Sequence, residues 1–407
     1  GVELIRAEVA RAEPAGVEGE AVGSLVEGNN RFAFDLYHRL AGDGEQNLIF
    51  SPYSISQAFS MVYGGAQGET AAQMAGVLHL LPAETQHEAF NALDQHLAGS
   101  DEAAGDVSGR ERNDEFGDPF QLHSANAVWI QDGFPLQDTY LALLAEQYGA
   151  GLWQVDFAGE QETAREAINA WVAQGTEGRI EELAPPLQLS AATRLVLANA
   201  IYFKASWLFP FGEEETEDGG FTLLDGTTVT VPLMHGQPRL PYYRGDGFQA
   251  VQLPYAGRDV EMLVVLPAAG QWPEVQERLG AAFLADIRQR VEVHDVTLTM
   301  PRFTFDSTVL LKDTLREMGM TLPFSPEEAE FGAMVEGGGL FIGDAVHKGT
   351  ITVDEQGTEA AAVTGVAMET SAYPTAEMRL DRPFIFAIVE QETGAILFLG
   401  RVLNPGG

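Results

Sequence analysis

The sequence predicts an α+β fold with a large mixed or antiparallel sheet, on three observations. Apolar residues recur at helical spacing in the first half of the chain, whereas β-branched and aromatic runs bounded by Gly, Pro and Asp follow beyond about residue 195. No linker is long enough to divide the chain. Helices mostly first and strands mostly later are typical of an α+β domain, so we expect one domain over residues 21–407.

The helical half begins after a short extension. Residues 1–20 are rich in Ala and Glu and are interrupted by Pro14, which predicts a loosely attached, flexible segment. A helix should follow over 21–40, and Ser51 with Pro52 marks a second helix start, with the hydroxyl as cap and proline in the first position. Further helices are expected near residues 69–80, 85–98, 136–148 and 161–174, and a polar, glycine-rich loop over 99–119.

Six runs in the second half predict the strands of the sheet. Each run is rich in β-branched or aromatic residues and is bounded by turn-forming residues. The runs cover residues 195–207, 248–255, 259–267, 295–305, 384–390 and 394–402.

The charge balance excludes several classes of partner. Sixty Asp and Glu residues against 23 Lys and Arg residues give a formal net charge of −37 and a sequence pI of about 4.3. A field of this sign repels phosphate backbones, anionic lipid headgroups and heparin-like polyanions, so we expect no nucleic acid, no membrane and no heparin partner. Among the basic residues, the only lysines are Lys204, Lys312 and Lys348.

Composition and chain start bear on the compartment. The chain has no cysteine, which excludes disulfides and thiolate metal sites. No apolar run approaches the roughly 20 residues that span a bilayer. The chain begins at Gly1 without an initiator Met, which indicates a processed chain whose signal peptide would already be gone. We expect an extracellular or cell-envelope protein.

The usual catalytic signatures are missing. The sequence has neither the Gly-x-Ser-x-Gly of a nucleophile elbow nor the Gly-Lys-Ser/Thr of a phosphate loop. His87 and Glu88 begin a zinc-protease pattern, but Asn91 stands where the second histidine ligand would be. We therefore expect no enzyme activity, no bound metal and no cofactor.

One segment near the C-terminus differs from an ordinary loop. From Thr358 to Met368 the chain has no Pro, Asn or Asp, although a surface connection needs turn residues. At the strand period of two, Glu359 and the next charge, Glu369 just after this segment, fall on one face. The other face carries Thr358, Ala360, Ala362, Thr364, Val366 and Met368. This pattern favours a half-buried strand over an Ala-rich linker or a short helix.

Several ordered motifs together resemble one family. Residues 355–362, Glu-Gln-Gly-Thr-Glu-Ala-Ala-Ala, resemble the hinge of the reactive-centre loop of the serpins, the serine protease inhibitors. Further serpin-like motifs lie at residues 47–55, 168–180, 197–211, 381–384 and 400–405. The similarity covers residues 25–405, and such a set is far more specific than a lone short pattern. The chain is identified on these motifs as a serpin of the inhibitory type and of prokaryotic origin.

The resemblance implies a fold and a mechanism. The fold would have a large central mixed β-sheet, further sheets, about eight or nine helices and an exposed reactive-centre loop at about residues 356–380. The partner would be a target serine protease, which forms a covalent acyl complex and is trapped when the cleaved loop inserts into the sheet. About 14 residues at roughly 3.3 Å each give a strand of about 45 Å, long enough to cross the sheet. The chain itself would be a monomer, with loop–sheet polymers possible.

The hinge composition implies an active inhibitor. The hinge consists of Glu355, Gln356, Gly357, Thr358, Glu359, Ala360, Ala361 and Ala362. In this family a bulky or charged hinge residue blocks rapid insertion, and most of these residues are small. Once inserted, the face that begins with Thr358 should point to the core and both glutamates to water. The alternative is a non-inhibitory serpin that acts as a binding or structural protein.

The scissile bond follows from family spacing. Counting from the hinge places it between Ser371 and Ala372, whereas counting back from Pro383 places it between Ala372 and Tyr373. Tyr373 itself would suit a chymotrypsin-like pocket, but Pro374 would then follow the bond, and serine proteases rarely accept proline there. We expect the cut at Ser371–Ala372, and the small residue before it indicates elastase-like or subtilisin-like targets.

The resemblance also assigns a polar cluster called the shutter. Ser51, Ser54, Asn199 and His347 match this cluster, which lies beneath the sheet and must part and re-form when the loop inserts. The alternative is an ordinary core hydrogen-bond network without a switching role.

A second cluster, the breach, lies where the loop first enters the sheet. Trp207, Lys312 and Glu355 match it. We hypothesise that Lys312 and Glu355 form a salt bridge that holds the top of the sheet. The alternative is a surface pair worth about 0 to 1 kcal/mol.

Overall fold

Nine α-helices occur in the part of the chain that this computed structural model describes, namely residues 1–16, 18–42, 44, 46–105, 120–183, 189–358 and 373–406. They are α1 (Glu20–Ala41), α2 (Pro52–Tyr63), α3 (Gly68–Leu78), α4 (Ala83–Gly105), α5 (Asp138–Tyr148), α6 (Gln161–Gly175), α7 (Trp272–Arg278), α8 (Ala281–Arg290) and α9 (Leu311–Glu317). The expected early helices are confirmed. Ser51 caps α2 by accepting a hydrogen bond from the Ser54 amide, with Pro52 in the first turn. The predicted loop over 99–119 is wrong at its start, because α4 continues to Gly105.

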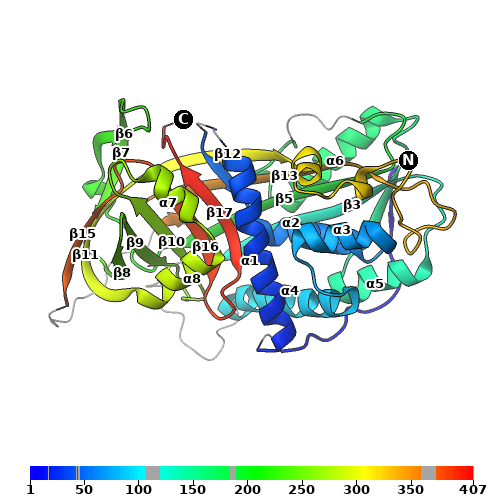
Figure 1. Cartoon of the computed structure of the whole chain (residues 1–407), viewed down its shortest axis with the longest axis horizontal. Helices are drawn as coiled ribbons and strands as arrows, with labels where there is room; N and C mark the ends of the chain where they lie inside the picture. Colours follow the sequence, from blue (N-terminus) through cyan, green and yellow to red (C-terminus); the bar gives the residue numbers. More distant parts are fainter. Residues whose placement is uncertain are drawn as a thin grey trace.

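Two large sheets form the body (Figure 1). The central sheet has the strand order β1-β4-β3-β5-β14-β13-β12, and its strands are β1 (Glu3–Ile5), β3 (Gln121–Gln131), β4 (Leu152–Val155), β5 (Leu195–Ser206), β12 (Phe303–Leu310), β13 (Ile342–Val353) and β14 (Gly357–Thr358). The second sheet contains β2 (Leu48–Phe50), β6 (Glu217–Thr222), β7 (Thr228–Gly236), β8 (Arg239–Gly245), β9 (Phe248–Pro254), β10 (Val260–Pro267), β11 (Glu292–Pro301), β15 (Thr375–Arg379), β16 (Phe384–Glu390) and β17 (Ile396–Val402). The expected α+β class is confirmed.

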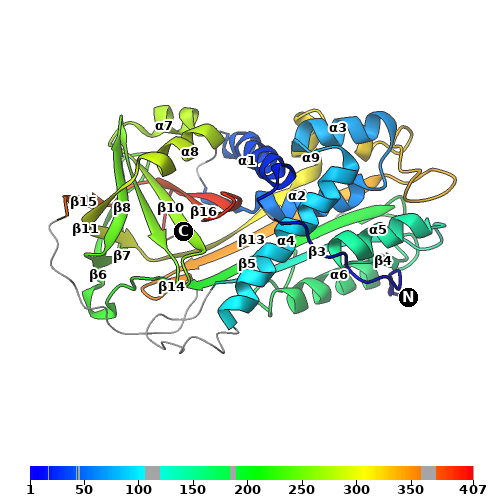
Figure 2. The same ribbon diagram turned by 90° about the horizontal axis from the view of Figure 1, so that it is seen from below.

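The central sheet is covered on both faces. On one face, α2 lies within the main apolar core. It contacts β3 and β5 of the central sheet and β17 of the second sheet. On the other face, α6 lies against β3 and β5 (Figure 2). Ile168 and Val172 of this helix share an apolar cluster with Ala198 and Ala200 of β5. Alternate residues of β5 therefore face different layers, which explains why the strand reads as a nearly continuous apolar run.

The N-terminal segment is attached to the body, which differs from the loose extension that its composition predicts. Glu3–Ile5 forms β1, which pairs antiparallel with the edge strand β4, with Leu4 opposite Trp153. Further along, the Ala12 amide donates to the Glu146 carbonyl at 2.8 Å. Pro14 prevents a helix but not an extended strand, and an open sheet edge offers free backbone groups to such a strand.

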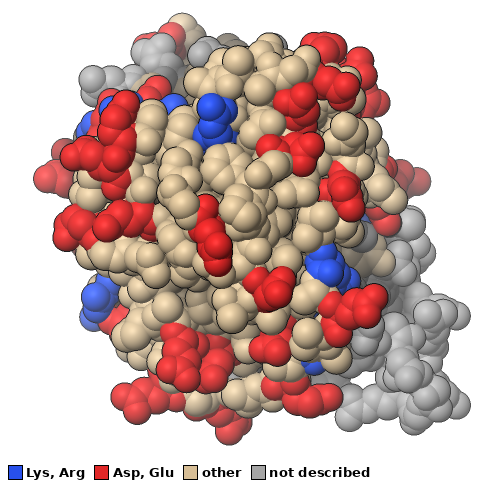
Figure 3. All heavy atoms as spheres, turned by 90° about the vertical axis from the view of Figure 1, so that its right-hand side faces the viewer, with Lys and Arg blue, Asp and Glu red and all other residues tan. Residues whose placement is uncertain are grey.

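The surface and the helices agree with the composition. On the pole seen in Figure 3, acidic side chains predominate over scattered basic ones, in line with the net charge of −37. Within the described ranges, none of the helices combines the length and the apolar character that crossing a lipid bilayer requires.

Candidate functional site

The central sheet is closed at one end and open at the other. β5 and β13 pair directly in parallel from Leu195–Ile342 to Tyr202–Thr350. Beyond that point they separate, and β14 lies between them (Figure 2). Thr358 lies opposite both Ala205 on β5 and Val353 on β13. Two hinge residues have therefore entered the sheet, while the rest of the β5–β13 contact is intact.

Both residues of β14 are tightly constrained. Gly357 has φ 153°, and a Cβ there would lie 2.1 Å from the carbonyl oxygen of Ala205, so only glycine fits. Thr358 is fully buried and faces the core, as the alternation predicts. Its hydroxyl lies 2.8 Å from the Tyr255 hydroxyl. Burial raises the pKa of Tyr255 far above its usual range, so the phenol stays neutral.

The breach brings Trp207 and Glu355 together around the base of the hinge. Trp207 stacks on Tyr255 with ring centroids 4.5 Å apart, and its indole Nε1 donates to the Asp354 carbonyl at 3.0 Å. The Trp207 amide donates to the Gln356 carbonyl at 2.8 Å. The aromatic pair thus fixes the backbone of the hinge just before β14.

The buried carboxylate of Glu355 forms an ion pair, but with a different partner from the expected one. Its carboxylate pairs with Arg302 and accepts a hydrogen bond from the Thr216 hydroxyl at 2.6 Å. Burial opposes ionisation, yet these hydrogen bonds more than offset it and hold the pKa of Glu355 below its usual value. The Arg302 guanidinium is half exposed, so the pair lies at the edge of the core.

The hypothesised Lys312–Glu355 salt bridge is wrong. Lys312 lies in α9, and its Nζ donates to the Gly343 carbonyl at 2.7 Å. Arg302 and Lys312 stand at opposite ends of β12, which has 8 residues and so a length of about 26 Å. Phe303, the first residue of β12, pairs with Val353 near the end of the chain segment that leads to Glu355. Arg302, just before β12, is therefore the basic residue that reaches Glu355.

The structure brings the four shutter residues together beneath the closed part of the sheet. The Ser51 amide donates to His347 Nε2 at 3.1 Å, so Nδ1 carries the proton and donates to Asn199 Oδ1. Asn199 Nδ2 donates to Ser54 Oγ at 2.6 Å. Burial lowers the pKa of His347 to about 3, so the ring is neutral at physiological pH. The cluster therefore joins β5, β13 and α2 through buried hydrogen bonds.

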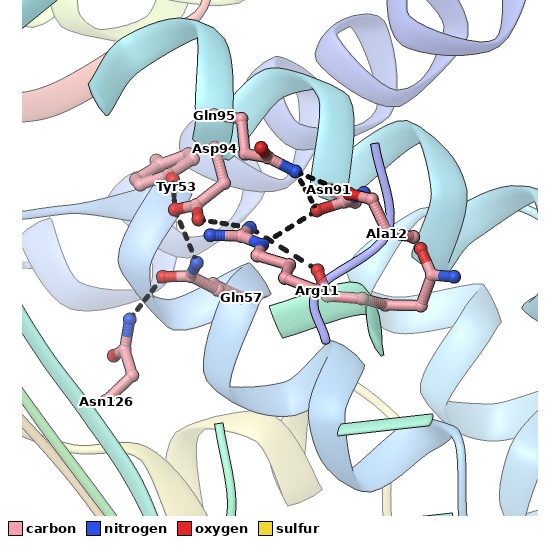
Figure 4. Close-up of polar contacts among 9 residues, drawn as sticks. Arg11, Ala12, Tyr53, Gln57, Asn91, Asp94, Gln95 and Asn126 are labelled. Carbon is pink, nitrogen blue, oxygen red and sulfur yellow. Dashed lines mark hydrogen bonds and ion pairs between the residues drawn. The ribbon is translucent and has the colours of Figure 1, made fainter. Parts of the chain in front are cut away.

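The shutter continues into a longer polar path that the sequence did not indicate, and Figure 4 shows the part of this path from Asn126 to Arg11. Asn199 Nδ2 also donates to Asn126 on β3, and Asn126 donates in turn to Gln57. Gln57 Nε2 donates to Asp94 at 2.8 Å, and Asp94 pairs with Arg11 at 2.6 Å. The attached N-terminal segment is therefore connected through side chains to the centre of the sheet.

The return end of the loop is fixed on the second sheet. β15 pairs in parallel with β11, and the Asp295 amide donates to the Pro374 carbonyl at 2.9 Å. The Arg239 guanidinium lies 4.3 Å from the ring centroid of Tyr373 and also pairs with Asp295. This contact holds the Tyr373 ring on the body of the protein.

The two fixed ends bracket residues 359–372, which lie outside the described residues. This bracket contains the predicted scissile pair, Ser371 and Ala372, and the hinge residues Glu359, Ala360, Ala361 and Ala362. Of the predicted hinge, Glu355 to Thr358 are described. Within the described part of the chain, no group of three or more His, Asp and Glu residues is placed to hold a metal ion.

Comparison with known proteins decides the family. Residues 27–405 match the family model of the serpins, the serine protease inhibitors. The chain belongs to the serpin family. An uncharacterized serpin-like protein of Thermococcus kodakarensis is 39% identical over 387 residues, which are 94% of this chain and 86% of that protein. The leukocyte elastase inhibitor of Bos taurus is 35% identical over 396 residues, covering 94% of this serpin and 99% of the inhibitor.

Solved serpin structures share the fold. Human thyroxine-binding globulin superposes with a TM-score of 0.82 at 30% identity, covering 95% of this chain and 99% of the globulin. The thermophilic serpin tengpin, in its native state, superposes with a TM-score of 0.81 at 25% identity. The match covers 98% of this chain and 97% of tengpin. The family therefore supplies a fold of the protease-inhibitor type, and prokaryotic relatives occur within it. Because one neighbour is a thyroxine-binding globulin in complex with thyroxine, the fold alone does not decide how an individual serpin acts.

Proposed function

We propose that this serpin is a suicide-substrate inhibitor of serine proteases, which traps the acyl-enzyme by inserting its cleaved loop between β5 and β13. The single observation that carries the proposal is the position of β14. Gly357 and Thr358 already lie between these two strands and pair with β5. The remaining loop residues can follow only if β5 and β13 part below Tyr202 and Thr350.

The chemistry needs no catalytic group from the serpin. The serine Oγ of the protease attacks the carbonyl carbon of Ser371, the bond from that carbon to the nitrogen of Ala372 breaks, and the amine takes a proton and leaves. Ser371 remains as an ester on the protease. As the loop enters, two rows of backbone hydrogen bonds replace the single row that joins β5 to β13. One row forms on each side of the inserted strand. Burial of the small face of the loop adds an apolar contribution.

The expected targets have a pocket for a small residue. Ser371 suits an elastase-like or subtilisin-like enzyme, and the bovine relative is named as an elastase inhibitor. The contact with Arg239 holds the Tyr373 ring away from an aromatic pocket. Incubation with subtilisin or pancreatic elastase should give a complex that survives denaturing gels. Mass spectrometry should find a released C-terminal peptide that begins at Ala372, whereas a peptide that begins at Pro374 would contradict the assignment.

A second candidate is a non-inhibitory serpin that serves as a carrier, since thyroxine-binding globulin shares the fold. The small hinge and the entered β14 favour inhibition over this alternative. A carrier of this kind would be cut by both proteases without forming a stable complex.

A further inference from the structure

Asp295 fixes the return end of the loop on the second sheet. In the ladder it lies opposite Arg239 on β8 and beside Thr375 on β15. Its amide donates to the Pro374 carbonyl at 2.9 Å, and its carboxylate pairs with Arg239 at 3.2 Å. The Arg239 guanidinium in turn lies 4.3 Å from the ring centroid of Tyr373. The Tyr373 ring is therefore part of a fixed surface.

Two large apolar side chains are exposed on this surface. Val293 is 43% exposed and Tyr373 is 38% exposed, and only seven large apolar side chains in the described part of the chain are exposed in this way. In the ladder, Val293 lies opposite Pro241. This pair is two positions from the pair of Asp295 and Arg239, so both pairs point to the same side of the sheet. We call Tyr373, Arg239, Pro241 and Val293 the return surface.

The charge around the return surface differs from that of the chain as a whole. Residues 239–302, which include β8 and β11, carry seven arginines and eight acidic residues, whereas the whole chain has 23 basic and 60 acidic residues. The pole at the other end of the molecule from β15 is predominantly acidic (Figure 3). Exposed Tyr, Arg and aliphatic side chains in a nearly neutral setting have the composition of the centre of a protein–protein interface.

The position of the return surface selects the partner. Tyr373 is two residues beyond the proposed cut at Ser371–Ala372, which is about 7 Å along an extended chain. A small folded domain is about 30 Å across, so a protease that holds this bond in its cleft comes to lie against the return surface. The loop itself therefore brings the target protease to this surface.

We propose that the return surface is a second contact site for the target protease, outside its active-site cleft, and that it sets how tightly the protease is held before the cut. The proposal rests on the proposed function. Val293 and Tyr373 offer mainly apolar area, so the part of the protease that meets them should be apolar. Arg239 is a positioning residue, because it fixes the Tyr373 ring in advance and so reduces the entropy lost on binding. The surface takes no part in strand insertion.

Charged substitutions at Val293 test the proposal. The variants are Val293→Glu and Val293→Lys, and the matched controls are Leu310→Glu and Leu310→Lys. Leu310 is 44% exposed and lies at the end of β12, next to α9 and far from β15 (Figure 2). The probe is subtilisin, or pancreatic elastase if only that enzyme forms a complex.

Four quantities are measured for each variant. Binding to the probe with its catalytic serine replaced by alanine gives the dissociation constant before any cut. The active probe gives the second-order rate constant and the stoichiometry of inhibition. The guanidinium midpoint of the serpin reports its folding.

Both Val293 variants should raise the dissociation constant about fivefold and lower the rate constant by a similar factor. The stoichiometry and the midpoint should keep their wild-type values, whereas a merely structural role of Val293 would lower the midpoint. The Leu310 variants should bind and inhibit as the wild-type protein does. Opposite effects of Glu and Lys at position 293 would show that net charge governs binding, which would overturn the proposal.

Complex formation by the wild-type protein separates this proposal from the proposed function. A wild-type protein that forms no complex with subtilisin or pancreatic elastase overturns both. A wild-type protein that forms the complex, while the Val293 and Leu310 variants bind alike, overturns the second contact site alone. A wild-type dimer on size-exclusion chromatography that Val293→Glu dissociates would assign the return surface to a second copy of the serpin and would also overturn the protease contact.

Discussion

The two ends of the β5–β13 contact are built differently. At the breach the strands are already apart, and the gap is filled by Thr358, a stacked aromatic pair and an ion pair at the edge of the core. At the shutter the strands are in contact and are joined by buried, neutral hydrogen bonds around His347. The first end holds the two-residue strand β14, and the second end keeps β5 and β13 in direct contact.

For the insertion that we propose, this difference indicates where the barrier lies. Gly357 and Thr358 already lie between the two strands, so the next step of that mechanism would be the parting of β5 and β13 toward the shutter. Each buried polar group there loses its partner as the strands separate, at a cost of about 1–3 kcal/mol per group until new bonds form. Changes at the breach should therefore alter whether the loop can enter, and changes at the shutter should alter how fast the sheet opens.

The largest effect is expected from Thr358→Arg at the breach. The guanidinium would have to occupy a fully buried site beside Tyr255 without an acidic partner, which costs about 3–5 kcal/mol. The variant should behave as a substrate, cleaved by subtilisin without a complex on denaturing gels. Thr358→Ser keeps the hydroxyl and serves as the matched control. A normal stoichiometry of inhibition for the arginine variant would contradict the insertion mechanism.

The next effect concerns His347 at the shutter and depends on pH. The buried ring has a pKa lowered to about 3, whereas the unfolded chain binds the proton near 6.5. The stability that the neutral ring contributes is therefore fully present above pH 6.5 and is lost as the pH falls from 6.5 toward 3. His347→Asn should lower the free energy of unfolding at pH 8 by about 1–3 kcal/mol, which a lower thermal midpoint would show. It should also flatten the decline of stability between pH 6.5 and 4.

A second histidine variant serves as a comparison for that slope. His87 is also buried with its pKa lowered, to about 4, so His87→Asn should flatten part of the same decline. Equal slopes for the wild-type protein and the His347 variant would show that the shutter ring does not govern acid stability.

At the breach, Glu355→Lys should raise the rate of polymer formation on heating. The lysine would face Arg302 across the site of the present ion pair, and the hinge would lose its anchor on Thr216. Because Arg302 is half exposed, Arg302→Ala should raise the rate of polymer formation by less than Glu355→Lys does. Lys312→Ala is the control, since that side chain does not contact Glu355. Native gels after a timed incubation at raised temperature would compare the amount of polymer formed by the wild-type protein and the three variants.

These residues also show what the sequence could and could not predict. The cap at Ser51 and the core-facing side of Thr358 depend on neighbours in the chain, so local patterns predicted them. The Arg302–Glu355 pair joins residues 53 positions apart, and only the pairing of β12 with β13 selects Arg302 over Lys312. β1 was missed for the same reason, because its strand character comes from the edge of β4 that it covers.

The smallest effect is expected at the far end of the polar path from the shutter. Arg11→Ala removes a partly buried partner of Asp94, which also accepts hydrogen bonds from Gln57 and Tyr53. We expect a loss of about 1 kcal/mol in the free energy of unfolding and a modest rise in polymer formation. Arg31→Ala breaks an exposed pair with Glu27 on α1 and should change neither. If the two variants behave alike, the N-terminal segment is only docked on the body; if only the Arg11 variant weakens the protein, the segment supports the shutter from outside the sheet.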